Sequence, residues 1–217
     1  MTVLTKARLD VAPLTKHIGA EIRGLDLRQR PDDETVAAIY QAWLKHLVLV
    51  FPGQDLSQED LLRVTTYFGE TGNLDRPAKY FPAGFSKMLP GIMLISNIRE
   101  NGEPIGALPD GELHFHSDGA HRKSPYRATT LYAIEIPSIG GETRFANLQM
   151  AYDALPEAMK KRLDGAIVNN HYDTGAALRE QTDENDDKLS NARHPIVRVH
   201  PDSGRKSPFL DRKSTRL

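Results

Sequence analysis

The chain has 217 residues, no cysteine, and 28 basic against 29 acidic residues, which leaves a formal net charge of −1. This length suffices for one sizeable domain with a core, and 39% hydrophobic and 26% charged residues are ordinary for a soluble globular protein. The balanced charge gives no electrostatic basis for binding nucleic acid or an anionic membrane. The absence of cysteine excludes disulfides, thiolate metal sites and cysteine nucleophiles, and it suits a reducing cytoplasm.

The first residues lack an apolar run of signal-peptide length, and no segment reaches the length of a membrane span, so we expect a cytoplasmic protein.

The N-terminal third of the sequence predicts short strands and two amphipathic helices. ARLDVAPL and GAEIRGLDL alternate apolar and polar residues, as strands do. DDETVAAIYQAWLKH has helical spacing after Asp32 or Asp33 as the N-cap. LVLVF predicts a fully buried strand, and SQEDLLRVTTYFG predicts a helix from Ser57, with a capping box to Asp60, that ends at Gly69.

Beyond residue 91 short strands dominate. A helical segment is expected over 148–163 with Gly165 as its C-cap, and the polar stretch 183–187 reads as a surface loop. The expected strands are 92–98, 112–118, 127–136, 143–146, 167–172 and 196–200. Turns rather than crossover helices join them, which favours an antiparallel barrel or sandwich with helices outside. Nucleotide-binding folds are disfavoured, because GxGxxG and GxxxxGK[ST] are both absent.

The stretch GELHFHSDGAH gathers the chemistry-bearing side chains. On an extended strand His114, His116 and Asp118 would point to one side. The HxD pair and a distant histidine would form the 2-His-1-carboxylate triad of non-haem Fe(II) oxygenases. The alternative is a hydrogen-bonded polar strand face, and His114 is either an orienting partner or idle. A zinc hydrolase or a serine nucleophile is poorly supported, since HExxH and GxSxG are absent.

Several ordered motifs resemble the taurine/2,4-D dioxygenase (TauD/TfdA) family. FHSD resembles the family's W-H-T/S-D segment, and IGAEIRGLDL resembles its N-terminal strand pair. KHLVLVFPGQDLSQEDLLRVTTYFGE resembles the segment after the first helix. RATTLYAIEIPSIGGETRFANLQMAYDALPEAMKKRL resembles the later strand, Gly-Gly-Asp/Glu-Thr turn and helices. HPIVRVHPDSGRKSPFL resembles the HPVVR-HP stretch. The resemblance covers nearly the whole chain.

The resemblance implies a double-stranded β-helix, a jelly-roll, cupin-like fold, and a dioxygenase that uses Fe(II), 2-oxoglutarate and O2 and releases succinate and CO2. His116 and Asp118 match the iron ligands. Thr143 matches the threonine that hydrogen-bonds a 2-oxoglutarate carboxylate; its hydroxyl follows a Gly-Gly turn and can donate to an anion, although a plain strand threonine is the alternative. Asn97 is a further candidate to face the pocket, against a polar strand residue that faces water.

The chain departs from the family pattern at its C-terminal end. The family's third ligand, a histidine in a WDN-R…H segment, and the arginine that pairs with 2-oxoglutarate have no match. His171, His194 and His200 are poor substitutes, and the last two match family histidines that do not bind iron. We therefore expect an incomplete domain over 1–210, a non-native tail over 211–217, weak iron binding and no turnover by this chain.

The substrate stays open among the small anions that the family oxidises, such as sulfonates, sulfate esters and aryloxyacetates; taurine itself is not supported, because the family's substrate-binding arginine has no match either. Candidate cationic or polar contacts, which are surface residues otherwise, are Arg76, Lys79, Tyr80, His121 and Arg122. Two other classes remain: a non-catalytic cupin-like binding protein, and a non-redox metal-dependent enzyme on the same barrel. We expect a small-molecule partner, with no nucleic acid or membrane. Family members commonly form homo-oligomers, and the sequence leaves that state open.

Overall fold

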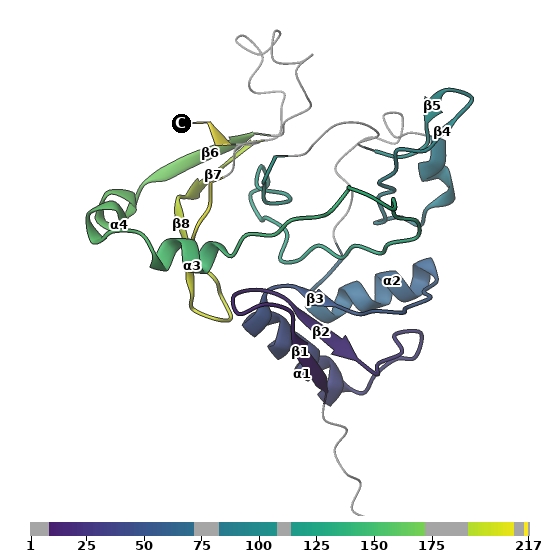
Figure 1. Cartoon of the computed structure of the whole chain (residues 1–217). Coiled ribbons are helices and arrows are strands. Elements are labelled where there is room, and N and C mark those ends of the chain that lie inside the picture. Colours follow the sequence, from purple (N-terminus) through teal and green to yellow (C-terminus); the bar gives the residue numbers. More distant parts are fainter. Residues whose placement is uncertain (1–8, 72–82, 108–113, 172–190, 211–214, 217) are drawn as a thin grey trace, which may run out of the picture. The chain divides into compact units, whose positions relative to one another are not determined.

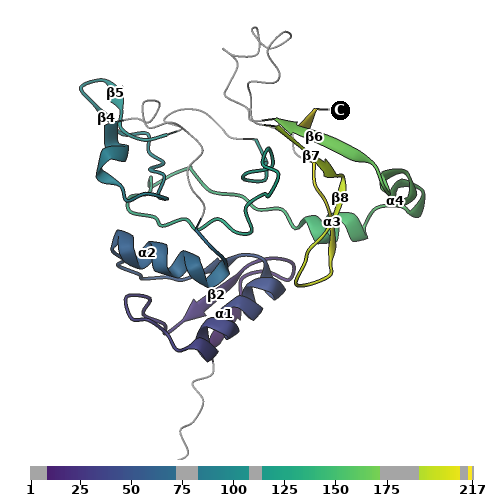
Figure 2. The same ribbon diagram turned by 180° about the vertical axis from the view of Figure 1, so that it is seen from behind.

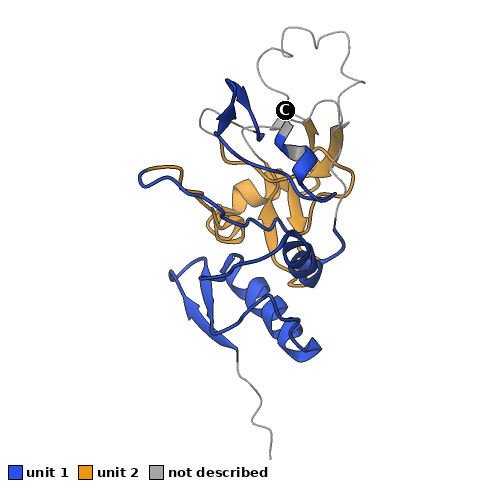
Figure 3. Ribbon diagram, turned by 90° about the vertical axis from the view of Figure 1, so that its right-hand side faces the viewer, with its two compact units in different colours: residues 1–113, 128–139 blue, residues 114–127, 140–217 orange. Residues whose placement is uncertain are grey.

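The computed structural model describes residues 9–71, 83–107, 114–171, 191–210 and 215–216 (Figure 1). The chain divides into two compact units, the first formed by residues 1–113 and 128–139 and the second by 114–127 and 140–217 (Figure 3). The segment with His116 and Asp118 therefore belongs to the second unit, together with the C-terminal strands.

The first unit contains a three-stranded sheet covered by a helix. Strand β1 (Asp10–Pro13) pairs antiparallel with β2 (Ala20–Arg23), and β2 pairs in parallel with β3 (Leu49–Val50). Helix α1 (Asp33–His46) lies over one face of this sheet in both views (Figures 1 and 2). The two N-terminal strands are confirmed. The expected full burial of LVLVF is wrong, because β3 is an edge strand and Val50 is 42% exposed.

Both predicted helices form with the predicted N-caps. The Asp32 carboxylate accepts a hydrogen bond from the Thr35 N–H, which lowers the pKa of Asp32. Helix α2 (Gln58–Thr65) begins at Ser57 with a capping box to Asp60. It continues as the 3-10 turn η1 (Thr66–Phe68), so the α-helical part ends before Gly69.

The remaining described residues of the first unit are largely irregular. It holds the 3-10 segment η3 (Ala83–Lys87) and the small hairpin of β4 (Arg99–Glu100) and β5 (Glu103–Pro104).

The strands expected over 92–98 and 127–136 are wrong: apart from an isolated bridge between Ile95 and Ala107, these residues form no ladder with any other part of the described chain. Strand conformation depends on a hydrogen-bonded neighbour, and without one several apolar side chains of the second stretch stay exposed, as Ile134 does at 79%.

The second unit is built on an antiparallel sheet. Strand β6 (Ile167–His171) lies between β7 (Asn191–Pro195) and β10 (Thr215–Arg216), and β8 (Val197–Val199) forms a hairpin with β9 (Lys206–Pro208). The strands expected over 167–172 and 196–200 are thus confirmed within a residue or two for the part described. The expected strand over 143–146 is wrong, since these residues are exposed and irregular.

The helical segment expected over 148–163 is two helices, α3 (Leu148–Asp153) and α4 (Glu157–Leu163). The break falls before Pro156, which has no N–H to continue the first helix and disfavours helical conformation at the residue before it. Helix α4 ends at Leu163 with Asp164 as its C-cap, so the expected C-cap Gly165 is wrong by one residue; Gly165 follows with φ +71°. In the described residues no helix is long and apolar enough to cross a membrane.

Candidate metal site

His116 and Asp118 meet in a turn rather than along a strand. Residues 114–118 form no strand, and the Ala120 N–H donates to the Ser117 carbonyl at 3.3 Å, which closes a turn through Asp118 and Gly119. The expected one-sided strand, with His114 on the same face, is therefore wrong. The turn nevertheless brings the His116 Nε2 to 3.1 Å from the Asp118 Oδ1.

The contact of His116 with the His114 carbonyl shows that the Nδ1 ring nitrogen carries a proton. Its Nδ1 lies 2.8 Å from the backbone carbonyl oxygen of His114, and a carbonyl only accepts, so Nδ1 carries a proton. In the neutral imidazole Nε2 then holds a lone pair that faces the Asp118 carboxylate. Two acceptors at this distance repel unless a proton or a cation is shared between them.

This arrangement fits two donors of a divalent metal site. Metal-binding imidazoles commonly donate their second ring N–H to a carbonyl, which fixes the tautomer and turns the other nitrogen toward the metal. The side chains of His116 and Asp118 are 23% and 46% exposed, so an ion can reach them. Among the described residues no group of three His, Cys, Asp or Glu side chains is placed to hold a metal, and the site there consists of this pair.

The turn is held from its C-terminal side. Gly119 has φ +68°, a conformation that favours glycine, and a Cβ there would lie 2.8 Å from the Tyr126 ring. The Arg122 guanidinium donates to the Tyr126 hydroxyl at 3.1 Å and stacks 4.9 Å from the centre of that ring. Arg122, a candidate substrate contact in the sequence, is thus occupied in the packing of its own loop.

The other predicted site residues that the structure describes all lie outside helices and strands. Thr143 belongs to the same unit but lies in an exposed irregular segment. Asn97 is exposed and belongs to the first unit, outside any strand. His121 is partly buried in the turn region. The remaining cationic and polar candidates, Arg76, Lys79 and Tyr80, lie outside the described residues, as does the predicted loop 183–187.

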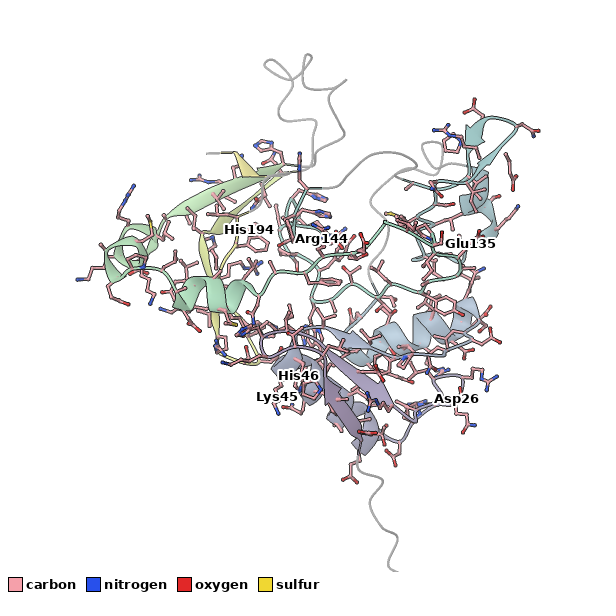
Figure 4. The ribbon with its side chains drawn as sticks, in the orientation of Figure 1. Asp26, Lys45, His46, Glu135, Arg144 and His194 are labelled. Carbon is pink, nitrogen blue, oxygen red and sulfur yellow. The ribbon has the colours of Figure 1, made fainter. Side chains whose placement is uncertain are left out.

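The three later histidines have structural contacts of their own. The His171 Nε2 accepts from the Asn169 amide at 3.0 Å, and the His200 Nδ1 accepts backbone N–H groups of the turn that follows it. His194 lies on β7 (Figure 4), is 5% exposed, and its Nε2 lies 2.9 Å from the Arg122 carbonyl. The sequence, in which His194 matches a family histidine that does not bind iron, gives no signal for this contact, because the two residues lie 72 positions apart.

Comparison with known proteins gives the same class that the HxD pair suggests. The sequence model of the family described as "Taurine catabolism dioxygenase TauD, TfdA family" matches residues 10–217. The (S)-phenoxypropionate/alpha-ketoglutarate-dioxygenase of Sphingobium herbicidovorans is 29% identical over 213 residues, covering 94% of this chain and 70% of that protein. The alpha-ketoglutarate-dependent sulfate ester dioxygenase of Pseudomonas putida is 32% identical over 216 residues, covering 92% of this chain and 65% of that protein.

A solved structure has the same fold. The crystal structure of AAD-2 in complex with Mn(II) and N-oxalylglycine matches 95% of this chain and 72% of that chain with a TM-score of 0.69 and 23% identity, a likeness that speaks for the fold alone.

The chain therefore belongs to the TauD/TfdA family, whose relatives named here are alpha-ketoglutarate-dependent dioxygenases.

Proposed function

We propose that this chain carries the HxD part of the Fe(II) site of a 2-oxoglutarate-dependent dioxygenase that hydroxylates a small, anionic organic substrate. The observation that carries the proposal is the His116–Asp118 pair, with Nε2 of the imidazole 3.1 Å from Oδ1 of the carboxylate and Nδ1 held by a backbone carbonyl. Family membership over residues 10–217 supports the reaction class. The strands of both units are, on this proposal, parts of a double-stranded β-helix.

Each residue of the pair has a defined part in holding the metal. His116 would supply a neutral nitrogen donor, because its other ring nitrogen keeps its proton on the His114 carbonyl. Asp118 would supply an oxygen donor and one negative charge, which offsets part of the charge of the ion. When bound, the iron would supply the oxygen chemistry, with 2-oxoglutarate as cosubstrate.

The proposed substrate class rests on the substrates of the relatives, because the residues of this chain restrict the choice of substrate only slightly. The matched proteins act on phenoxypropionate and on sulfate esters, as their names state. Both substrates are small organic anions, and we propose the same class here. Thr143 is proposed to bind a carboxylate of the cosubstrate, and Asn97 to face the substrate pocket.

The test begins with metal binding rather than turnover. Mn(II) is a redox-inactive probe, and N-oxalylglycine is an analogue of 2-oxoglutarate; both are added to the whole chain while Mn(II) binding is followed by electron paramagnetic resonance. We expect weak Mn(II) binding that N-oxalylglycine strengthens, and its loss in His116→Ala and Asp118→Ala. His114→Ala is the matched control, because the replacement keeps the backbone carbonyl that fixes the tautomer of His116.

Two outcomes would contradict the proposal. Mn(II) binding that survives both substitutions would place the metal elsewhere in the chain. Metal binding that N-oxalylglycine does not change, that is stronger for Zn(II) than for Mn(II), and that is accompanied by hydrolysis of ester substrates would favour a non-redox metal enzyme.

Succinate production from 2-oxoglutarate in the presence of an aryloxy acid or an alkyl sulfate would establish the reaction and identify the substrate class.

A further inference from the structure

In the second unit, the buried side chain of His194 joins the turn of residues 117–122 to the sheet. The turn from Ser117 to Arg122 contains two successive backbone hydrogen bonds, Ala120 N–H to Ser117 at 3.3 Å and Arg122 N–H to Gly119 at 2.9 Å. No strand in the described part of the chain pairs with this run of short turns, so contacts at its ends help to fix its geometry.

His194 holds the C-terminal end of this turn. Its Nε2 lies 2.9 Å from the backbone oxygen of Arg122, four residues after Asp118, and the carbonyl only accepts, so His194 donates from Nε2. The imidazole is 5% exposed, which removes competing water from this hydrogen bond.

The ring of His194 is itself fixed by packing. The edge of one ring meets the face of the other between His194 and Phe209, with centroids 5.2 Å apart and planes at 86°. The Arg198 guanidinium stacks 4.6 Å from the centre of the Phe209 ring. His194 also pairs in register with the buried Val168 on β6. An imidazole held in this way by Phe209 and by the pairing of β7 with β6 transmits the position of the sheet to the turn.

We infer that His194 is a positioning residue of the metal site: its buried Nε2–H holds the Arg122 carbonyl and thereby keeps Asp118 beside His116. The metal part of this inference rests on the proposed function, whereas the ordering of the turn does not. Asp118 sits at the start of the tethered segment, and the two-donor geometry needs its carboxylate to stay at hydrogen-bond distance from His116.

The test compares His194→Leu, which fills similar space without a donor, with His194→Gln, which places an amide N–H near the position of the imidazole Nε2. The first readout is amide hydrogen exchange of Ala120 and Arg122 in the metal-free chain. We expect about fivefold faster exchange in His194→Leu and rates close to wild type in His194→Gln, which is the range of one net hydrogen bond. The second readout is Mn(II) affinity with N-oxalylglycine, expected to fall about tenfold in His194→Leu and to recover in His194→Gln.

Ala192→Gly is the matched control, because Ala192 is 5% exposed on β7 itself, so that its replacement weakens the same strand while keeping the His194 imidazole. Equal effects of Ala192→Gly and His194→Leu on the turn would overturn the inference, and so would unchanged exchange in His194→Leu. If the wild-type chain takes up no Mn(II) while the exchange contrast persists, the proposed function fails and the positioning contact stands.

A measurement on the wild-type chain decides the matter if His194→Leu does not fold. Nitrogen-15 NMR of the imidazoles reports which ring nitrogen of His194 carries the proton. We expect a slowly exchanging Nε2–H. A neutral ring protonated only at Nδ1 would exclude the hydrogen bond to Arg122 and overturn the inference.

Discussion

Replacement of Ile39 by alanine tests how much the sheet and helix of the first unit depend on a single buried side chain. Ile39 lies on α1 and is 0% exposed. Ile→Ala removes three carbon atoms, each worth about 0.8 kcal/mol of transfer free energy when buried, and incomplete collapse of the cavity adds to the loss. The higher helix propensity of alanine returns about 0.4 kcal/mol. We expect the free energy of unfolding of this unit to fall by about 2–4 kcal/mol.

The single tryptophan of the chain provides the assay. Trp43 lies on the same helix, with its ring centroid 5.5 Å from those of Tyr40 and Phe68, so its fluorescence reports the packing of this unit. Urea unfolding followed by this fluorescence gives the midpoint for wild type and for Ile39→Ala. Gln41→Ala, at an exposed position of α1, is the control and should shift the midpoint little. Equal midpoints for the two variants would refute the assignment of Ile39 to the core.

Three further predictions use the same chain. Ser57→Ala removes the capping hydrogen bond of α2 and should lower the free energy of unfolding of the first unit by about 1 kcal/mol in the same urea assay, whereas an unchanged midpoint would show that the cap is not needed. Hydrogen bonds from Arg63 and then Ser57 lower the pKa of Asp60, so the Asp60 carboxylate stabilises the folded chain above its unfolded pKa of about 3.9 and this contribution is lost as the pH falls through the lower folded pKa. Asp60→Asn should therefore flatten the fall in stability below about pH 4, and a variant that keeps the full acid dependence would contradict this cause. Gly119→Ala should loosen the turn of residues 117–122, because the φ of +68° is strained for alanine and the added Cβ meets the Tyr126 ring; faster amide exchange across the turn is the measurement, and wild-type rates would contradict the strain.

Local signals made the helices of the first unit predictable. Asp32 and Ser57 are polar caps that precede helical apolar spacing, and a capping side chain satisfies backbone N–H groups a few residues away. These interactions are local in the sequence, so no knowledge of distant residues was needed. Pro156 is also a local signal, and it accounts for the break between the two helices of the segment 148–163. The apolar residues around it keep helical spacing, so the sequence predicted one continuous helical segment.

The strands were less predictable because a strand depends on its neighbour. Residues 127–136 alternate and carry β-branched side chains, yet the described chain offers them no ladder, and Ile134 stays 79% exposed. In contrast, β6 and β7 pair along five residues each, from Ile167 to His171 and from Asn191 to Pro195. Similar residue patterns thus had different outcomes according to the partner available.

The sequence by itself determined the family and the two candidate donor residues, because an imidazole and a carboxylate two positions apart are fixed by the order of the chain. Tertiary structure alone decided how they face each other: a turn closed by Ala120 replaced the expected strand, and the His114 carbonyl set the tautomer of His116. It also decided that His194 contacts Arg122, 72 residues away along the chain. Hydrogen bonds between distant segments depend on how strands pack, and no spacing in the sequence encodes that distance.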